Sequence, residues 1–108
     1  MDDGVVRLLV SGEVDMTAAG DLTAAGAAGL AAPACTRLDV DLSGVTFLDS
    51  SGIGALVAIR TEARNAGKRM QVVDAPERVR QVIDVCGLTA EFGMSRDPAQ
   101  STTQWFTP

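Results

Sequence analysis

The strongest constraint on the fold is the regular alternation of short strand-like segments with helix-like segments along the chain. The segments expected to be strands are residues 5–10, 38–42, 70–73 and 92–94. The segments expected to be helices are residues 17–31, 53–66, 76–86 and a short one from 97. Alternation of this kind predicts an α/β domain with a mixed, mostly parallel sheet of four to five strands, about four helices and right-handed crossovers.

Apolar spacing and capping residues mark the ends and faces of these elements. Positions 38, 40 and 42 are Leu, Val and Leu between aspartates, which places them on one face of a strand. Thr17 is the expected cap of the first helix, and either Asp49 or Ser50 caps the second. The core-facing stripe of the second helix is expected to contain positions 53, 56, 57 and 63, with 59 on its flank.

The length of the chain predicts a single domain. For 108 residues and 11.2 kDa, surface scaling predicts that roughly 65% of the unfolded chain's surface becomes buried, which suffices for one core but not two. We expect the domain to cover residues 1–96, with a tail over 97–108 that could form a short helix. In that tail, Trp105 and Phe106 either pack back onto the domain, which we favour, or contact a partner.

Composition excludes several classes of function. Nine Lys and Arg against 14 Asp and Glu give a net charge of −5, and the longest basic run is Lys68-Arg69, so we expect no direct binding of nucleic acid. The chain has no histidine, which removes Ser-His-Asp and Cys-His catalysis as well as histidine metal ligands. We therefore expect a protein that is not an enzyme.

The sequence also carries no signal for export or membrane insertion. No apolar run reaches the roughly 18 residues of a membrane span. The first residues, Met1-Asp2-Asp3-Gly4, are acidic, whereas a signal peptide is basic and then apolar. The expectation is a cytoplasmic protein without membrane contact, in which Cys35 and Cys86 are reduced and mostly buried.

Three aspartates are the candidate ligands for a divalent metal. They are Asp39, Asp41 and Asp49. Asp39 and Asp41 lie on the strand face opposite the apolar positions 38, 40 and 42, so we expect that face to be solvated and to hold no metal.

The segment that could carry chemistry is Asp49-Ser50-Ser51-Gly52-Ile53-Gly54, where a strand gives way to the second helix. One interpretation is structural, with Asp49 or Ser50 capping the helix. The other is a phosphoacceptor serine, whose phosphate would accept N–H bonds at the positive end of the helix dipole. Gly52 and Gly54 would leave the first turn bare for the approach of another protein. The segment is neither a P-loop nor a nucleophile elbow, because GxxxxGK[ST] and GxSxG are absent.

Several segments together resemble the STAS domain family, and specifically the bacterial anti-sigma factor antagonists, or anti-anti-sigma factors. The signature-like segment is Leu42-Ser43-Gly44-Val45-Thr46-Phe47-Leu48-Asp49-Ser50-Ser51-Gly52-Ile53-Gly54. Further segments that are similar in the same order are Ser11-Gly12-Glu13-Val14-Asp15, Met70-Gln71-Val72-Val73 and Val82-Ile83-Asp84-Val85-Cys86-Gly87-Leu88. The resemblance covers about residues 4–94.

This resemblance implies a mechanism of partner switching. The first serine of the D-S-S-G motif, Ser50, would be phosphorylated by an anti-sigma factor that is itself an ATP-dependent serine kinase. The unphosphorylated chain would bind that kinase and release a sigma factor for transcription, and a PP2C-type phosphatase would remove the phosphate. The kinase holds the ATP, so this chain would need no cofactor.

The expected partner-binding surface centres on the start of the second helix. Its members are Asp15, Asp49, Ser50, Ser51, Gly52, Gly54, Arg60 and Arg64. Arg60 and Arg64 share one face of the helix and either orient acidic groups of a partner or are simply solvated. The alternative function is that of a non-switching STAS scaffold, or an accessory subunit of a transporter or of a larger signalling assembly.

Overall fold

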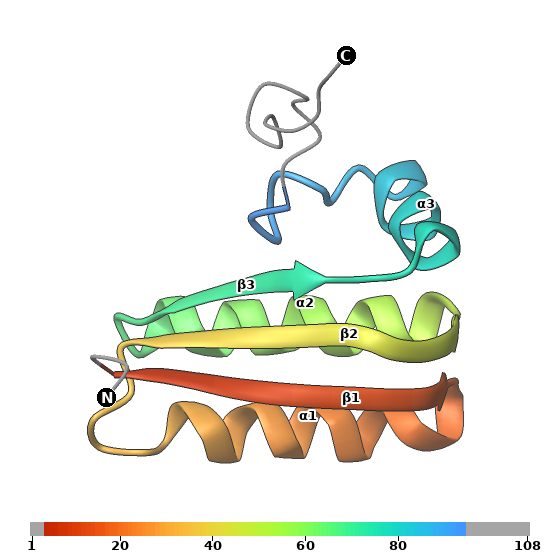
Figure 1. Ribbon diagram of the computed structural model, residues 1–108. Coiled ribbons are helices and arrows are strands. Elements are labelled where there is room, and N and C mark those ends of the chain that lie inside the picture. Colours follow the sequence, from red (N-terminus) through yellow and green to blue (C-terminus); the bar gives the residue numbers. More distant parts are fainter. Residues whose placement is uncertain (1–3, 95–108) are drawn as a thin grey trace.

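The computed structural model describes residues 4–94 and confirms the α/β class. The elements are β1 (Val5–Val14), α1 (Met16–Leu30), β2 (Arg37–Leu48), α2 (Ser50–Asn65), β3 (Arg69–Asp74) and α3 (Glu77–Val85). The strands form one sheet in the order β1-β2-β3, and both pairs are parallel. Figure 1 shows α1 and α2 on one side of this sheet, with α3 beyond the end of β3.

Much of the core lies between the sheet and these two helices, and Val79 and Ile83 of α3 and Phe92 of the turn after it belong to the same core. Leu38, Val40 and Leu42 of the central strand are completely buried, as the alternation in the sequence predicted. A Cβ built on Gly26 of α1 would lie 2.6 Å from Ile59 of α2, so glycine allows the two helices to pack closely. This packing fixes where α1 and α2 begin relative to the strands before them.

The expected number of elements was too high for the described part of the chain, and residues 4–94 contain no antiparallel strand pair. Residues 4–94 form three strands and three helices. The expected strand 92–94 is instead a series of turns, because Phe92 N–H donates to Leu88 and Met94 N–H to Thr89, and Gly93 has a φ of 68°. Only the Phe92 carbonyl joins the sheet edge, where it accepts from Val72 N–H at 2.8 Å. The expected helix from 97 and the Trp105-Phe106 pair lie outside the described residues.

The helices α1 and α2 begin earlier than expected, at aspartate caps, whereas α3 begins at Glu77, one residue after the expected Pro76. Asp15 rather than Thr17 caps α1, and α2 begins at Ser50, directly after its cap Asp49, rather than at Ile53. In α2 the stripe that faces the core also differs from the expectation, because Ile59 is buried whereas Val57 is 37% exposed.

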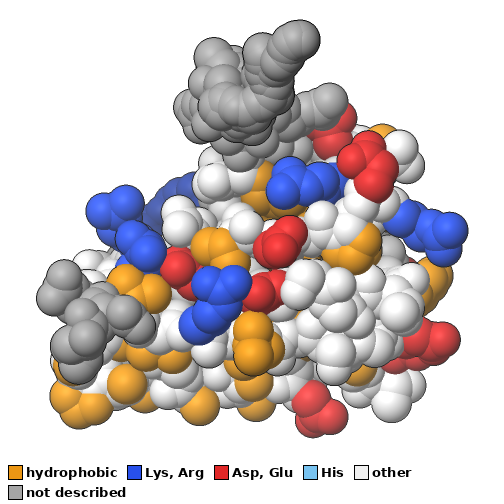
Figure 2. Space-filling model, viewed as in Figure 1, with side chains coloured by type: hydrophobic (Ala, Val, Ile, Leu, Met, Phe, Trp, Pro, Cys, Tyr) orange, Lys and Arg blue, Asp and Glu red, His pale blue; other side chains and the backbone are white. Residues whose placement is uncertain are grey.

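The other face of the sheet is not the solvated acidic face that we expected. Asp39 and Asp41 are both only 6% exposed. Each is covered by its neighbours on the sheet and by an ion pair: Arg37 Nε lies 2.8 Å from Asp39, and an Arg7 guanidinium nitrogen lies 2.6 Å from Asp41. Figure 2 views this face, with side chains of both charges spread across the strands.

Hydrogen bonds shift the pKa values of Asp41 and Arg37, one member of each salt bridge. The hydroxyl and the backbone N–H of Ser43, together with the Arg7 guanidinium, lower the pKa of Asp41 to about 2. The hydrogen bond and the charge of Asp39 raise the pKa of Arg37. Asp41 is therefore charged over the physiological pH range, and an arginine neutralises each of the two acids locally.

The two cysteines differ in exposure. Both are free thiols, and Cys35 is buried as expected, but Cys86 at the end of α3 is exposed. The expectation of two mostly buried thiols is therefore wrong for Cys86.

Candidate functional site

The carboxyl ends of β1 and β2 bring two helix starts side by side. Val14 and Leu48 are register partners at the end of the β1–β2 pair. Asp15 follows the first strand and Asp49 the second, and each caps the helix that comes next. The sheet thus places Asp15 next to Asp49 and Ser50, three residues that the sequence assigned to one surface.

Asp49 determines the geometry of the α2 start. Its Oδ1 accepts from Ser51 N–H at 2.9 Å and from Gly52 N–H at 3.1 Å, and its own N–H donates to the Val14 carbonyl at 3.3 Å. The structural interpretation of the D-S-S-G segment is therefore correct for Asp49. Because an aspartate already caps the helix, the hydroxyl of Ser50 is not needed for capping.

Ser50 occupies the first position of α2 and is exposed. Its side chain makes no hydrogen bond within residues 4–94. Ser51 is half-buried and its N–H is held by the cap. Of the two serines, Ser50 is the more exposed to an approaching protein.

Gly52 and Gly54 have different roles, which corrects the expectation that both leave the helix surface bare. Gly52 is buried, and a Cβ there would lie 2.5 Å from the Leu48 side chain and 2.9 Å from the Val14 carbonyl oxygen. Gly52 therefore lets α2 approach the end of β1. Gly54 is exposed with open space around it, so it does leave the helix surface bare.

The exposed face of α2 continues from Ser50 with little charge. Gly54, Val57 and Thr61 follow it at helical spacing, and all are exposed. At the neighbouring helix start, Met16 is the first residue of α1 and is 78% exposed. Exposed apolar side chains beside a hydroxyl suit contact with another protein surface better than catalysis.

Sequence reasoning missed Met16 and Val57. Val57 fits the apolar stripe as well as its neighbours do, and only the packing against α1 and the sheet separates it from them. Met16 directly follows Asp15. If Asp15 rather than Thr17 is taken as the cap, the sequence places Met16 at the exposed first position of the helix.

The charged side chains at the two helix starts are carboxylates, and only the helix dipoles contribute positive potential there. Asp15 accepts from Thr17 N–H and Ala18 N–H in the same way that Asp49 accepts from its two partners. A phosphate on Ser50 would bring a charge of about −1.5 to −2 next to these two carboxylates. The N–H groups that would offset it are shared with Asp49, so the modified surface would carry a strong net negative charge.

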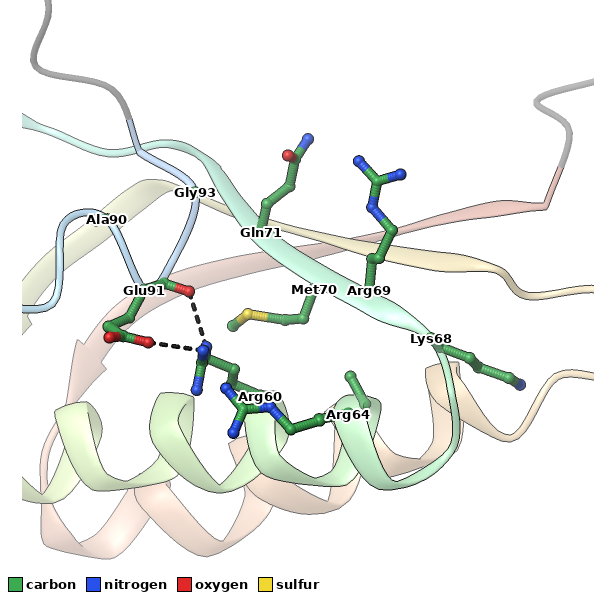
Figure 3. Close-up of a pocket in the computed structure, with 10 residues that line it drawn as sticks. Arg60, Arg64, Lys68, Arg69, Met70, Gln71, Ala90, Glu91 and Gly93 are labelled. Carbon is green, nitrogen blue, oxygen red and sulfur yellow. Dashed lines mark hydrogen bonds and ion pairs between the residues drawn. The ribbon is translucent and has the colours of Figure 1, made fainter.

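Arg60 and Arg64 lie away from this surface, toward the other end of α2. Arg60 is about 15 Å along the helix axis from Ser50, and Arg64 about 21 Å. Arg60 Nε donates to the Glu91 carbonyl at 2.9 Å, and a terminal nitrogen lies 2.6 Å from the Glu91 carboxylate (Figure 3). Arg60 is thus held within the chain, whereas Arg64 is exposed.

The described residues offer neither a metal centre nor a membrane-spanning helix. Within residues 4–94, acidic and cysteine side chains form no group of three or more that could hold a metal ion. None of the helices in that part of the chain is both long and apolar enough to span a membrane.

Comparison with known proteins identifies what the chain is similar to. The sequence model of a family described as "Mlab, STAS domain" matches residues 1–94. An anti-sigma factor antagonist from Mycobacterium paratuberculosis is 32% identical, with a TM-score of 0.74, over 95% of this chain and 86% of that one. A search of curated proteins finds no match.

Two more distant structures share the fold. The anti-sigma factor antagonist SpoIIAA in its unphosphorylated form has 21% identity and a TM-score of 0.70, over 98% of this chain and 93% of its own. The STAS domain of a SulP transporter from Vibrio cholerae has 21% identity and a TM-score of 0.64, over 86% of this chain and 71% of its own.

Proposed function

The chain belongs to the STAS domain family, and from that premise we propose that it is an anti-sigma factor antagonist switched off by phosphorylation of Ser50. In its unphosphorylated form it binds an anti-sigma factor serine kinase in the cytoplasm and so releases a sigma factor for transcription. A PP2C-type phosphatase restores the active form. The kinase binds the ATP, and this chain contributes no catalytic group, no cofactor and no contact with nucleic acid.

One observation carries the proposal: the exposed hydroxyl of Ser50 stands at the first position of a helix that Asp49 already caps. Such a serine is free for modification without loss of the cap. The match to an antagonist of 32% identity supports the same assignment. Asp15, Ser51 and Gly54 complete the proposed contact surface, to which the exposed Met16 adds apolar area.

The physical basis of the switch is desolvation of charge. In the free chain, water and the helix dipole stabilise a phosphate on Ser50. In a complex, the partner would have to bury that phosphate against Asp49 and Asp15. A mispaired buried charge costs roughly 2–5 kcal/mol, which corresponds to roughly 30- to several thousand-fold weaker binding.

The test is phosphorylation by an anti-sigma factor kinase encoded in the same genome, with ATP, followed by peptide mapping. Wild type and Ser51→Ala should each gain one phosphate on Ser50, and Ser50→Ala should gain none. Stoichiometric labelling of Ser50→Ala, or mapping of the phosphate to Ser51, would show that the assignment is wrong.

Calorimetry with the same kinase tests the switch itself. Ser50→Ala should bind the kinase as the unphosphorylated chain does. Ser50→Asp should bind less tightly, but the loss should be smaller than for the phosphorylated chain because a carboxylate has about half the charge. Equal affinity of all these forms would rule out an electrostatic switch.

The second candidate function is a non-switching STAS subunit of a transporter or another assembly. The similarity in fold to the STAS domain of a SulP transporter favours it. In that case Ser50 stays unmodified in the cell, and both Ser50→Ala and Ser50→Asp retain the partner. Mass spectrometry of the protein purified from its source cell separates the two functions, since only the antagonist yields the phosphorylated peptide.

A further inference from the structure

A pocket of about 380 Å³ lies at the outer edge of β3, far from Ser50. It is formed by the second half of α2, the start of β3 and the turn that contains Glu91 and Gly93 (Figure 3). Four of the nine basic residues of the chain line it, and Glu91 is its one acidic lining residue. They are Arg60, Arg64, Lys68 and Arg69. We call these residues, with Met70 and Gln71, the β3 edge pocket.

Two of the four cations build the pocket and are not available to a ligand. Arg60 is paired with Glu91, which anchors one wall. Lys68 Nζ donates to the carbonyl oxygens of Leu30 and Ala32, at the end of α1. These contacts hold the loop before β3 and the turn around Glu91 in place.

The other two cations are free and lie on opposite sides of the strand. Arg64 and Arg69 are exposed, and neither guanidinium group makes a hydrogen bond or an ion pair within residues 4–94. In Figure 3, Met70 points toward Arg60 and Arg64 on the helix side of β3, whereas Arg69 and Gln71 point to the other side. The strand edge therefore separates one free guanidinium from the other.

The backbone of Met70 faces the same edge. Arg69 N–H donates inward to Thr36, next to β2, at 3.1 Å, and Val72 N–H donates outward to Phe92 at 2.8 Å. Backbone groups of successive residues in a strand point to alternate sides. The N–H and the carbonyl of Met70 therefore point outward into the pocket, where no residue of the described part of the chain pairs with them.

We propose that the β3 edge pocket binds an extended, acidic polypeptide segment of a partner protein by adding a short strand to β3. An extended segment places alternate side chains on opposite faces of a sheet. Its backbone would pair with Met70, and acidic side chains on its two faces would reach Arg64 on one side and Arg69 on the other. This inference concerns a surface separate from Ser50 and does not rest on the proposed switch.

Charge and geometry favour an acidic segment of a partner over the chain's own tail and over a small polyanion. The chain's own tail, residues 95–108, contains one arginine and one aspartate, so it has no net charge to offer the pocket. A small polyanion could engage the free cations on one side of the strand edge but not the backbone and both sides together.

The test uses the full chain and a synthetic seven-residue peptide in which three consecutive glutamates are flanked by threonines, so that an extended peptide has acidic side chains on both faces. Nuclear magnetic resonance titration and amide hydrogen exchange follow the Met70 N–H. The peptide should slow exchange of that amide, and its affinity should fall about tenfold in Arg64→Gln/Arg69→Gln. The matched control is Arg78→Gln, which removes an exposed arginine of α3 and should leave binding unchanged.

Two control ligands separate strand addition from simple attraction of anions. The same peptide with alternate backbone nitrogens methylated, so that it cannot pair with Met70, should bind at least several-fold more weakly. Inorganic tripolyphosphate should not protect the Met70 amide. Equal binding of the methylated peptide, or protection by tripolyphosphate, would overturn the proposal in favour of an unspecific anion patch.

Absence of peptide binding would also overturn it. Basic residues at a sheet edge would then serve only to prevent edge-to-edge aggregation. In that case Arg64→Gln/Arg69→Gln should increase self-association of the chain, which sedimentation measures directly.

Discussion

Replacement of either of two glycines in α2 by alanine should have opposite effects on stability, although they are only two positions apart. Gly52 is buried against β1, where a Cβ would lie 2.5 Å from Leu48 Cδ1, 2.9 Å from the Val14 carbonyl oxygen and 3.0 Å from Val14 Cγ1. Gly54 has no atom within 4 Å of the same position. Gly54→Ala is therefore a matched control for Gly52→Ala.

The magnitudes follow from two terms. Alanine in a helix is favoured over glycine by roughly 0.5–1 kcal/mol, and we expect Gly54→Ala to gain about that amount. Gly52→Ala has the same gain but adds an overpacking cost of roughly 1–3 kcal/mol. The clash cannot be relieved by a side-chain rotation alone, because one of the clashing atoms is the backbone oxygen of Val14. That oxygen also accepts the N–H of Asp49, the cap of α2. The difference between the two variants isolates the steric cost.

Urea unfolding and thermal melting of both variants measure this difference. Gly52→Ala should unfold at a lower urea concentration than wild type, and Gly54→Ala at a higher one. In a domain of this size each kcal/mol corresponds to roughly 4–8 °C in melting temperature. If Gly52→Ala is as stable as Gly54→Ala, the close approach of α2 to β1 is wrong, and with it the position of Ser50.

Two further perturbations test the cap and the buried ion pair. Asp49→Ala should lower the free energy of unfolding by about 1 kcal/mol, because two backbone N–H groups lose their acceptor; unchanged urea unfolding would contradict the cap. The pKa of Asp41 is lowered from 3.8 to about 2, so its charged form contributes stability that is complete above about pH 4 and is lost as the pH falls through about 2. Asp41→Asn should therefore show a flatter decline of stability between pH 4 and pH 2, and a decline parallel to wild type would refute this role.

The order of elements could be predicted from the sequence, but their lengths could not. The strand around residues 5–10 continues to Val14, through Gly12 with a φ of 86°, because β2 lies beside it and supplies the pairing. The local β-propensity of residues 11–14 does not reveal that β2 will pair with them. In the same way, Phe92 lies next to the sheet edge and has β-forming character, yet hydrogen bonds within the turn determine its conformation.

The ion pair that covers Asp41 joins different strands, whereas the one that covers Asp39 is with Arg37 of the same strand. Alternation correctly placed both on the face opposite the apolar positions of β2. Arg7 comes from β1, so its pairing with Asp41 depends on strand register, which the sequence pattern does not give. A short acid on a central strand is covered by the longer side chains of its neighbours even where no helix lies over it.

The candidate site was predicted best where its residues are consecutive. Residues 49–54 formed a recognisable unit in the sequence, and the structure separates their roles into a cap at Asp49, an exposed Ser50, a buried Gly52 and an open Gly54. The β3 edge pocket gave no such signal, because its basic residues are spread over 60–69 and only the packing of α2 beside β3 gathers them.

The two ends of α2 carry opposite charge, and their separation makes them independent. A phosphate on Ser50 would add to the carboxylates of Asp15 and Asp49 at the start of the helix, whereas Arg64 lies about 21 Å further along the axis. At physiological ionic strength the screening length is about 8 Å, so little of that charge is felt at the β3 edge pocket. Under the two proposals, phosphorylation of Ser50 would act on a partner at the helix start without weakening an acidic segment bound at the other end, and a partner that uses both surfaces would be loosened rather than fully released.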